Sequence, residues 1–402
     1  MVLELIFAIL LGVLAGTLTG LIPGIHINLI ASILLASLSL PFISHISPII
    51  LVIFIVAMSI THTFIDFIPS IYLGAPDEDS FLSILPGHQF MLKGLAHSAF
   101  ILTLYGSLLA LPVIILYTPI FIKFLPFLFT STKSAMPYIL IFLSIYLILR
   151  EENLATGFIS FSLAGFLGLL TFNLPVKEPL LPMLSGLFGL SSLILSLNAR
   201  NLPRKQILQP LKYIKIEKRE FIKSLSASIF IVPFFSFLPG IGSGHASLIS
   251  SELFNLKEKS FLFLNGAANT IIMGLSFITV YSIGKTRTGS AAATKDILDN
   301  ITLDNLFLII LAIVIVSIIS FILGIYLSKL TAKFINKINY RILTISVIAI
   351  LILVNLLLSN WLGLLILLTS SVLGIFTVLS RSRRTNLMAS LVVPAIVYYL
   401  SS

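Results

Sequence analysis

The chain has 402 residues, of which 58% are hydrophobic and only 10% are charged, with a formal net charge of +10. A soluble domain is about one quarter charged, so this composition excludes an ordinary soluble protein, and the basic residues are expected to set membrane orientation rather than to bind nucleic acid. The sequence has no cysteine, which excludes disulfides, iron–sulfur clusters and thiol chemistry. Continuous apolar runs near 20 residues recur from end to end and predict an all-α polytopic membrane protein rather than a barrel.

The first half is predicted to begin with a broken membrane segment. Its first apolar run, residues 3–22, lacks a basic n-region and a small-residue cleavage site, so we interpret it as mature structure and not as a signal peptide. The run breaks at Pro23-Gly24 and resumes at Asn28. The later apolar segments of this half cover about residues 49–73, 81–92, 95–117, 137–149, 154–172 and 183–197, with an acidic connection at 74–80.

A basic stretch, residues 199–220, follows these segments and is predicted to link a first repeat (1–198) to a second repeat (221–402). The second half replays the order of the first, because it opens with a segment that is broken at Pro239-Gly240. That segment covers residues 222–254, and later apolar runs cover about residues 261–283, 306–327, 342–358, 362–379 and 387–400, with a polar connection at 284–300.

A short phrase near the end of each half supports a repeat. Residues 167–171 read LGLLT and residues 373–377 read LGIFT, an offset of 374 − 168 = 206 between their glycines. The two Pro-Gly breaks are separated by a similar offset, 239 − 23 = 216. These two anchors predict a structural repeat, and a chance match of short phrases is the alternative.

The basic residues predict the orientation of the segments, since Lys and Arg concentrate in cytoplasmic loops. If each broken segment is a re-entrant hairpin, the basic clusters at about residues 199–220, 329–341 and 381–384 all fall on the cytoplasmic side. Each half then holds one hairpin plus about five transmembrane helices, and because five is odd the two halves are inverted. If the broken segments instead cross the whole membrane, the basic clusters no longer fall so consistently on the cytoplasmic side. We therefore predict a multi-pass plasma membrane protein with cytoplasmic basic loops.

Paired broken helices in corresponding halves indicate the binding site of a secondary transporter. A half-helix that starts inside the membrane points free N–H groups and the positive end of its dipole at a bound anion. The alternative is that the glycines only let helices pack closely. The predicted substrate-binding residues belong to the two broken segments and to polar positions that follow the second: Pro23, Gly24, His26, Asn28, Pro239, Gly240, Gly242, Ser243, Gly244, His245, Asn265, Asn269, Gly289 and Ser290.

Other polar residues inside apolar runs suggest a second role, because ionisable groups in a membrane are costly unless they are functional or paired. His62 and Asp66 lie four residues apart on one predicted helix face, and we assign them to ion coupling or gating. A local hydrogen bond is the alternative for this pair. Asn265 and Asn269 have the same spacing, and interhelical packing is the alternative reading for them.

Several phrases carry a family resemblance. They are Gly74-Ala75-Pro76 and Lys93-Gly94-Leu95-Ala96 in the first half, and Leu238-Pro239-Gly240-Ile241-Gly242, Asn265-Gly266-Ala267-Ala268-Asn269 and Gly289-Ser290-Ala291 in the second. Together they resemble the large permease subunit of tripartite tricarboxylate transporters (TctA type). Pro86-Gly87-His88 departs from the Asp-Gly-Tyr phrase of that family. The resemblance implies cation-coupled uptake of a carboxylate with a small membrane subunit and an extracytoplasmic binding protein.

These observations predict a permease that takes up a small anionic solute, a di- or tricarboxylate, by alternating access. No ATP-binding motif is present in the sequence, so a sodium or proton gradient is expected to drive transport, and no cofactor is expected. The protein is expected to contact the lipid bilayer and to be able to form a homo-oligomer. The alternative is a polyprenyl-phosphate translocase, because Pro239-Gly240-Ile241-Gly242-Ser243-Gly244 resembles the Pro-Gly-x-Ser-Gly phrase of that family. An intramembrane enzyme is disfavoured, since the sequence lacks a His-Glu-x-x-His motif.

Overall fold

A computed structural model describes residues 2–22, 45–73, 84–132, 135–149, 151–176, 179–198, 205–238, 242–286, 288–335, 337 and 340–401. Regular structure in these ranges is helical and includes no strand. Seven of the described helices are long and apolar enough to cross a membrane: Val2–Leu21, Pro48–Leu73, Ala96–Ser131, Leu154–Asn173, Glu258–Ile283, Leu303–Ile335 and Thr344–Leu379. The prediction of a polytopic helical membrane protein is therefore confirmed, with further apolar helices that are shorter.

The helices of the first half follow the predicted order. They are α1 (Val2–Leu21), α4 (Pro48–Ile65) with a π-helical turn (Pro69–Leu73), α5 (Ile84–Leu92), α6 (Ala96–Thr132), α7 (Met136–Leu149), α8 (Leu154–Asn173), α9 (Leu180–Leu184), a π-helical segment (Ser185–Leu190) and α10 (Ser191–Asn198). The first Pro-Gly break lies outside the described residues.

The second half contains a broken segment as predicted. It consists of α11 (Lys218–Phe230), a 3-10 turn (Val232–Ser236) and α12 (Ser243–Phe254). Helices of 13 and 12 residues are each under about 20 Å long and do not span a hydrocarbon core of about 30 Å. The helices that follow are α13 (Glu258–Ile283), α14 (Gly289–Leu298), α15 (Leu303–Ile335), α16 (Tyr340–Leu379) and α17 (Ala389–Ser401), with a 3-10 turn at Arg384–Met388 before α17.

Three predicted boundaries were wrong. Helix α6 continues well past residue 117 although it contains Pro112, Pro119 and Pro126, since membrane helices tolerate proline where neighbours satisfy the freed backbone groups. The polar connection 284–300 forms helix α14, whose first turn is capped by the Thr288 side chain. Helix α11 begins at Lys218, so the last residues of the predicted linker are helical.

Helix α16 corresponds to two predicted segments. Its 40 residues would extend about 60 Å, twice the hydrocarbon thickness, as one straight helix. The backbone breaks at Asn360, which has φ 58° and ψ −164°. This break falls between the predicted segments 342–358 and 362–379, and its combination of φ and ψ is one that residues other than glycine rarely adopt.

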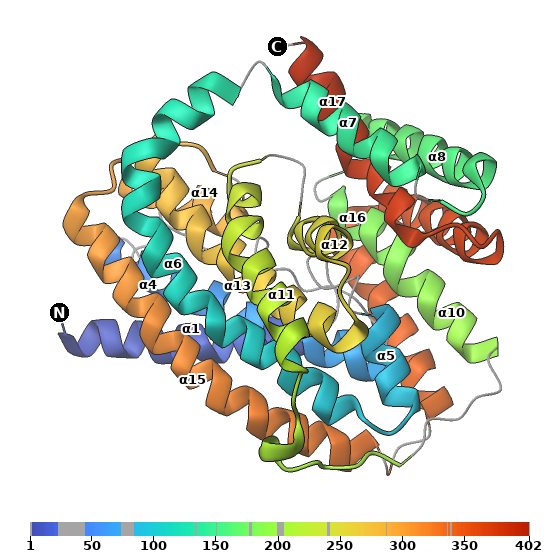
Figure 1. Cartoon of the computed structure of the whole chain (residues 1–402), viewed down its shortest axis with the longest axis horizontal. Coiled ribbons are helices and arrows are strands. Elements are labelled where there is room, and N and C mark those ends of the chain that lie inside the picture. Colours follow the sequence, from blue (N-terminus) through green and yellow to red (C-terminus); the bar gives the residue numbers. More distant parts are fainter. Residues whose placement is uncertain are drawn as a thin grey trace.

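The helices form two bundles with separate apolar cores (Figure 1). The larger core is built mainly by α1, α4, α6, α13 and α15, on the left of the view. The smaller core is built by α8, α9, the π-helical segment, α16 and α17, on the right. Helix α12 lies between the bundles, because Ala246 and Ile249 belong to the larger core and Leu248 packs against the smaller one. Each half of the chain contributes helices to both cores, and α17 contributes to both, with Val392 in the larger core and Ala389 in the smaller one.

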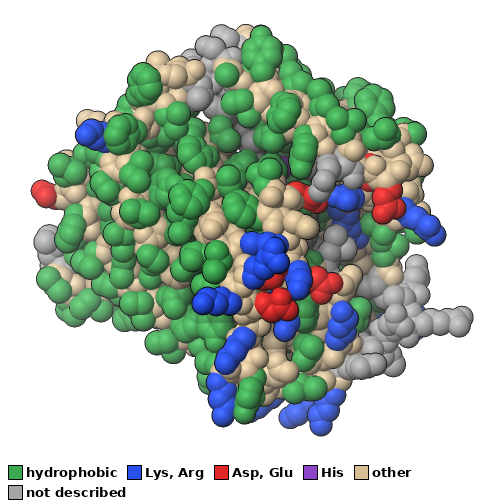
Figure 2. All heavy atoms as spheres, in the orientation of Figure 1, with side chains coloured by type: hydrophobic (Ala, Val, Ile, Leu, Met, Phe, Trp, Pro, Cys, Tyr) green, Lys and Arg blue, Asp and Glu red, His purple; other side chains and the backbone are tan. Residues whose placement is uncertain are grey.

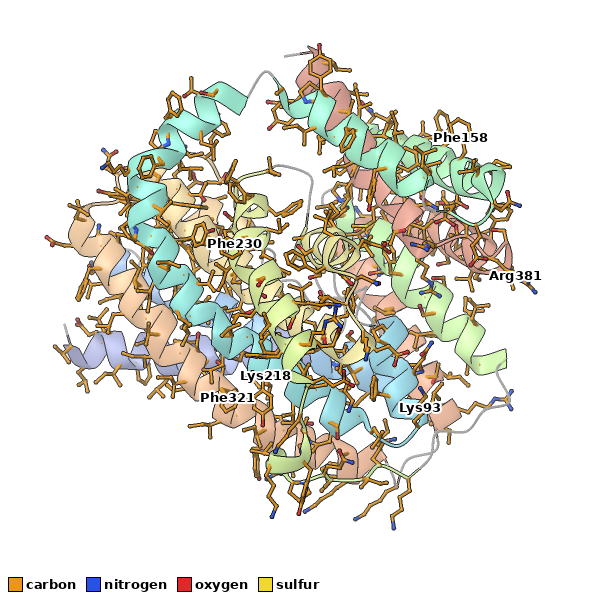
Figure 3. The ribbon with its side chains drawn as sticks, in the orientation of Figure 1. Lys93, Phe158, Lys218, Phe230, Phe321 and Arg381 are labelled. Atoms are coloured by element: carbon orange, nitrogen blue, oxygen red, sulfur yellow. The ribbon has the colours of Figure 1, made fainter. Side chains whose placement is uncertain are left out.

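The surface separates into an apolar face and a basic region. In Figure 2, apolar side chains cover the face over α6 and α15, whereas Lys and Arg gather around the lower end of α11 and the segment before it. Lys93, Lys218 and Arg381 lie in the lower and right-hand parts of the same view in Figure 3, and the apolar Phe230 projects from the upper part of α11. This separation is the arrangement expected for an apolar membrane-embedded face and a basic cytoplasmic side.

Candidate functional site

A buried chain of polar side chains joins α4, α12 and α13. The Asn269 side-chain amide donates a hydrogen bond of 2.8 Å to Asp66 Oδ2. The Ser243 hydroxyl donates a longer bond of 3.4 Å to Asn269 Oδ1. Asp66 is only 1% exposed, and both partners are also buried. The structure therefore brings together Asp66, which the sequence predicts for ion coupling, and Asn269 and Ser243, which it predicts for substrate binding.

Asn265 lies one helical turn before Asn269 on the same face of α13. Its side chain is 0% exposed, and within the described part of the chain neither its amide nitrogen nor its amide oxygen has a hydrogen-bond partner. A buried amide left unsatisfied costs about 1–3 kcal/mol, so such a group requires an explanation. A ligand that is bound only during function would supply the missing partners.

The N-terminus of α12 is directed at this polar chain, because Ser243 is the first residue of the helix. The free N–H groups of the first turn and the dipole create a positive potential there. Gly242 donates its N–H to His245 Nδ1 at 2.9 Å, so a neutral His245 carries its proton on Nε2. Gly244 and His245 are both buried within this first turn. The second broken segment thus presents Gly242, Ser243, Gly244 and His245 close together.

His62 lies on α4 one turn from Asp66, and its Nδ1 is 3.0 Å from the Thr19 hydroxyl of α1. The single proton of that hydroxyl is donated to the Gly16 carbonyl at 3.1 Å. Thr19 therefore accepts from His62, which must carry a proton on Nδ1. This bond fixes the tautomer of a neutral His62.

Ser290 lies apart from this cluster. It is buried near the start of α14, which Gly289 begins, and its hydroxyl is 2.7 Å from that of Ser59 on α4. Ser59 precedes Asp66 by seven residues, or about 10 Å along the helix. The start of α14 is therefore a second polar contact on α4 and not part of the Asp66 cluster. Six predicted site residues lie outside the described residues: Pro23, Gly24, His26, Asn28, Pro239 and Gly240.

Sequence reasoning missed several buried hydroxyl pairs around the same helices. The Thr63 and Thr270 hydroxyls are 3.1 Å apart and join α4 to α13. The Ser320 hydroxyl of α15 donates to that of Thr61 at 3.0 Å. The signal was present in the sequence, because Ser59, Thr61, His62, Thr63 and Asp66 fall within eight residues of an otherwise apolar run.

A helical membrane architecture with a buried polar cluster beside a broken segment is typical of membrane transport proteins. Residues 6–389 match the family described as the tripartite tricarboxylate transporter TctA family, so the chain belongs to that family. Members of this family are transporters and typically not enzymes. The resemblance stated from the sequence motifs is thereby confirmed.

The chain is also similar to an uncharacterized protein, MJ1079, of Methanocaldococcus jannaschii. The two are 31% identical over 409 residues, which cover 98% of each chain. No solved structure was found to match. Membership of the family together with the candidate spans identifies a multi-pass membrane protein of a transporter family.

Proposed function

We propose that this protein is the permease that moves a small di- or tricarboxylate across the plasma membrane, driven by a sodium or proton gradient. The observation that carries the proposal is the Asp66–Asn269–Ser243 chain at the start of α12, with the unsatisfied amide of Asn265 one turn away. Membership of the TctA family supports a carboxylate as the solute.

The first turn of α12 would bind the carboxylate through its N–H groups and the Ser243 hydroxyl, with the Asn265 amide as a further donor. Gly242, Gly244 and His245 would shape this turn. Pro23, Gly24, His26 and Asn28 would supply the opposing contacts from the first broken segment, and Pro239 and Gly240 would hold the second break open. Gly289 and Ser290 would position α4 through Ser59.

The carboxylate of Asp66 would couple the binding of a cation to the binding of the solute. An ionised Asp66 about 5 Å from an anionic solute would repel it by about 3 kcal/mol at an effective dielectric constant near 20. A sodium ion or proton bound at Asp66 would remove that repulsion, so cation and solute would favour each other's binding. His62, on the same face of α4, is placed to take part in cation uptake or gating.

Alternating access would move the two bundles against each other around α12, which packs on both cores. Inverted repeats would give this motion two equivalent end states. In support, the glycines of the two repeated phrases make reciprocal contacts. Gly168 of α8 lies against the Ser390 carbonyl near the end of the second half, and Gly374 of α16 lies against the Leu187 carbonyl near the end of the first.

The tripartite system named in the family description implies other subunits. We expect a small membrane subunit and an extracytoplasmic binding protein as partners. The basic loops would lie in the cytoplasm, and a homo-oligomer would be compatible with the exposed apolar faces of α1 and α15.

The test combines binding and transport. Thermal unfolding of purified protein with citrate, succinate or a short-chain polyprenyl phosphate reports binding without any partner subunit. Uptake of labelled citrate or succinate into proteoliposomes, with sodium and proton gradients imposed separately, then reports coupling. Stabilisation by a carboxylate and uptake under one gradient are expected. Stabilisation by polyprenyl phosphate alone would replace the proposal with the lipid-carrier alternative.

A further inference from the structure

A surface groove runs between α6, α11 and the segment that precedes α11. Its volume is about 520 Å³. Leu102, Phe263 and Ile214 form a buried floor, and the half-buried Tyr105 and Leu108 form part of the rim. Behind this floor, Gly106 of α6 lies directly against the Phe263 carbonyl of α13, so the two helices pack closely there. The lining is almost entirely apolar, with a single cation.

That cation is Lys215, which belongs to the basic segment that precedes α11. The short segment around it also carries Lys212, Lys218 and Arg219, all exposed. Within the described residues none of these four cations forms an ion pair. The mouth of the groove therefore has an excess of positive charge.

The two carboxylates on this segment do not neutralise that charge, because each is engaged elsewhere. Glu217 pairs with Lys257 at 3.1 Å, and Glu220 pairs with Lys223 at 3.0 Å. Hydrogen bonds from the Lys257 backbone N–H and the Lys223 side chain also lower the pKa of Glu220 below its ordinary value, so Glu220 stays ionised and bound to them. The groove mouth thus fits an anionic group.

The same segment also exposes large apolar side chains, namely those of Ile207, Leu208, Leu211 and Tyr213. Apolar and aromatic residues interleaved with lysines are typical of a segment at the membrane surface, where lysine stems lie along the apolar region and the ammonium groups reach the headgroups. Figure 2 agrees, since basic side chains border the apolar face there. The groove therefore opens at the headgroup level.

The length of the groove fits a lipid chain. Its α6 wall, from Leu102 to Pro112, is about 15 Å long, which is half the hydrocarbon core and so one leaflet. This length matches an acyl chain that extends from the headgroups to the middle of the bilayer. The apolar lining of the groove suits a flexible hydrocarbon chain of that length.

We propose that this groove binds one chain of an anionic phospholipid, with the phosphate at Lys215 and its basic neighbours. The lipid would hold the linker between the two halves against α6. Binding would be strongest to anionic lipids and weaker at high salt. This inference does not depend on the solute that the protein carries.

The test is native mass spectrometry of the protein released from nanodiscs that contain phosphatidylcholine alone or an equal mixture with phosphatidylglycerol. Wild type is expected to retain one phosphatidylglycerol in preference to phosphatidylcholine. Leu108→Trp, which fills the groove, should lose the retained lipid. The triple variant K212Q/K215Q/K218Q should lose the preference at least ~10-fold, since each basic residue near the surface contributes about 1 kcal/mol.

The matched control is K329Q/K333Q, which removes two exposed basic residues from the end of α15 and should leave retention unchanged. Size-exclusion profiles show whether Leu108→Trp folds, and the triple variant tests the proposal with exposed residues alone. Equal retention of both lipids by wild type, or unchanged preference in the triple variant, would overturn the proposal. If wild type retains a small polypeptide and Leu108→Trp does not, the occupant of the groove is a protein and the lipid proposal is overturned.

Discussion

Helices α13 and α15 are both long membrane spans, but the more buried of the two is the less apolar one. In a soluble protein the more buried helix is the more apolar. Helix α13 has a mean hydropathy of 1.6 over its most apolar stretch, and 94% of that stretch is buried within the protein. Helix α15 has a mean hydropathy of 3.4 and is only 39% buried. Because lipid is the outer solvent, the most apolar helix faces outward and the polar helix is enclosed. The polar side chains of α13 are tolerated only because neighbouring helices surround them.

The largest effect is expected where α13 is most tightly enclosed. Gly266 lies against the backbone of Thr103 on α6, so Gly266→Leu would force two backbones apart and prevent folding. Ile318→Phe enlarges an exposed side chain on α15 and should fold normally. The yield of monodisperse protein in detergent is the measurement. Normal yield of Gly266→Leu would mean that α13 is not held as closely as the contact indicates.

A smaller but still large effect is expected at Asp66. Asp66→Asn mimics the neutralised carboxylate, so it should still bind the solute but lose about 100-fold in gradient-driven uptake, near the upper end of typical coupling energies. Asp304→Asn, at the exposed start of α15, is the control and should transport like wild type. Uptake and thermal stabilisation by citrate are measured together. Full gradient-driven accumulation by Asp66→Asn would remove this residue from coupling.

Substitutions of the two asparagines of α13 should affect different properties, solute binding at Asn265 and protein stability at Asn269. Asn265→Leu removes an amide that has no partner in the described structure, so it should not lower the thermal midpoint but should weaken solute binding about 10-fold. Asn269→Leu removes the partner of Asp66 and Ser243 and should destabilise the protein by about 1–3 kcal/mol. If Asn265→Leu is the destabilising variant instead, its amide has a structural role.

The smallest effect is expected at the contact between α12 and the segment that precedes the 3-10 turn at Arg384–Met388. Arg383 pairs with Glu252 of α12 at 3.1 Å on a partly exposed surface, where ion pairs contribute about 0–1 kcal/mol. Glu252→Gln should therefore change the uptake rate no more than about threefold, without altering solute affinity. The charge reversal E252R/R383E should restore the wild-type rate. A tenfold loss that the reversal does not repair would assign Glu252 to the transport site.

The sequence by itself determined the class of architecture, the order of the helices and the breaks near residues 240 and 360, because hydrophobic length and Pro, Gly and Asn positions are local signals. It also indicated Asp66, Asn269 and Ser243 individually. It did not determine that Asn269 bonds to Asp66, 203 residues away, or that Ser290 contacts α4 at a different level. Those pairings depend on how α4, α12, α13 and α14 pack, and long-range packing leaves no periodic trace in the sequence. The length of α6 was likewise decided by neighbouring helices, which stabilise a helix through three prolines that would end it in water.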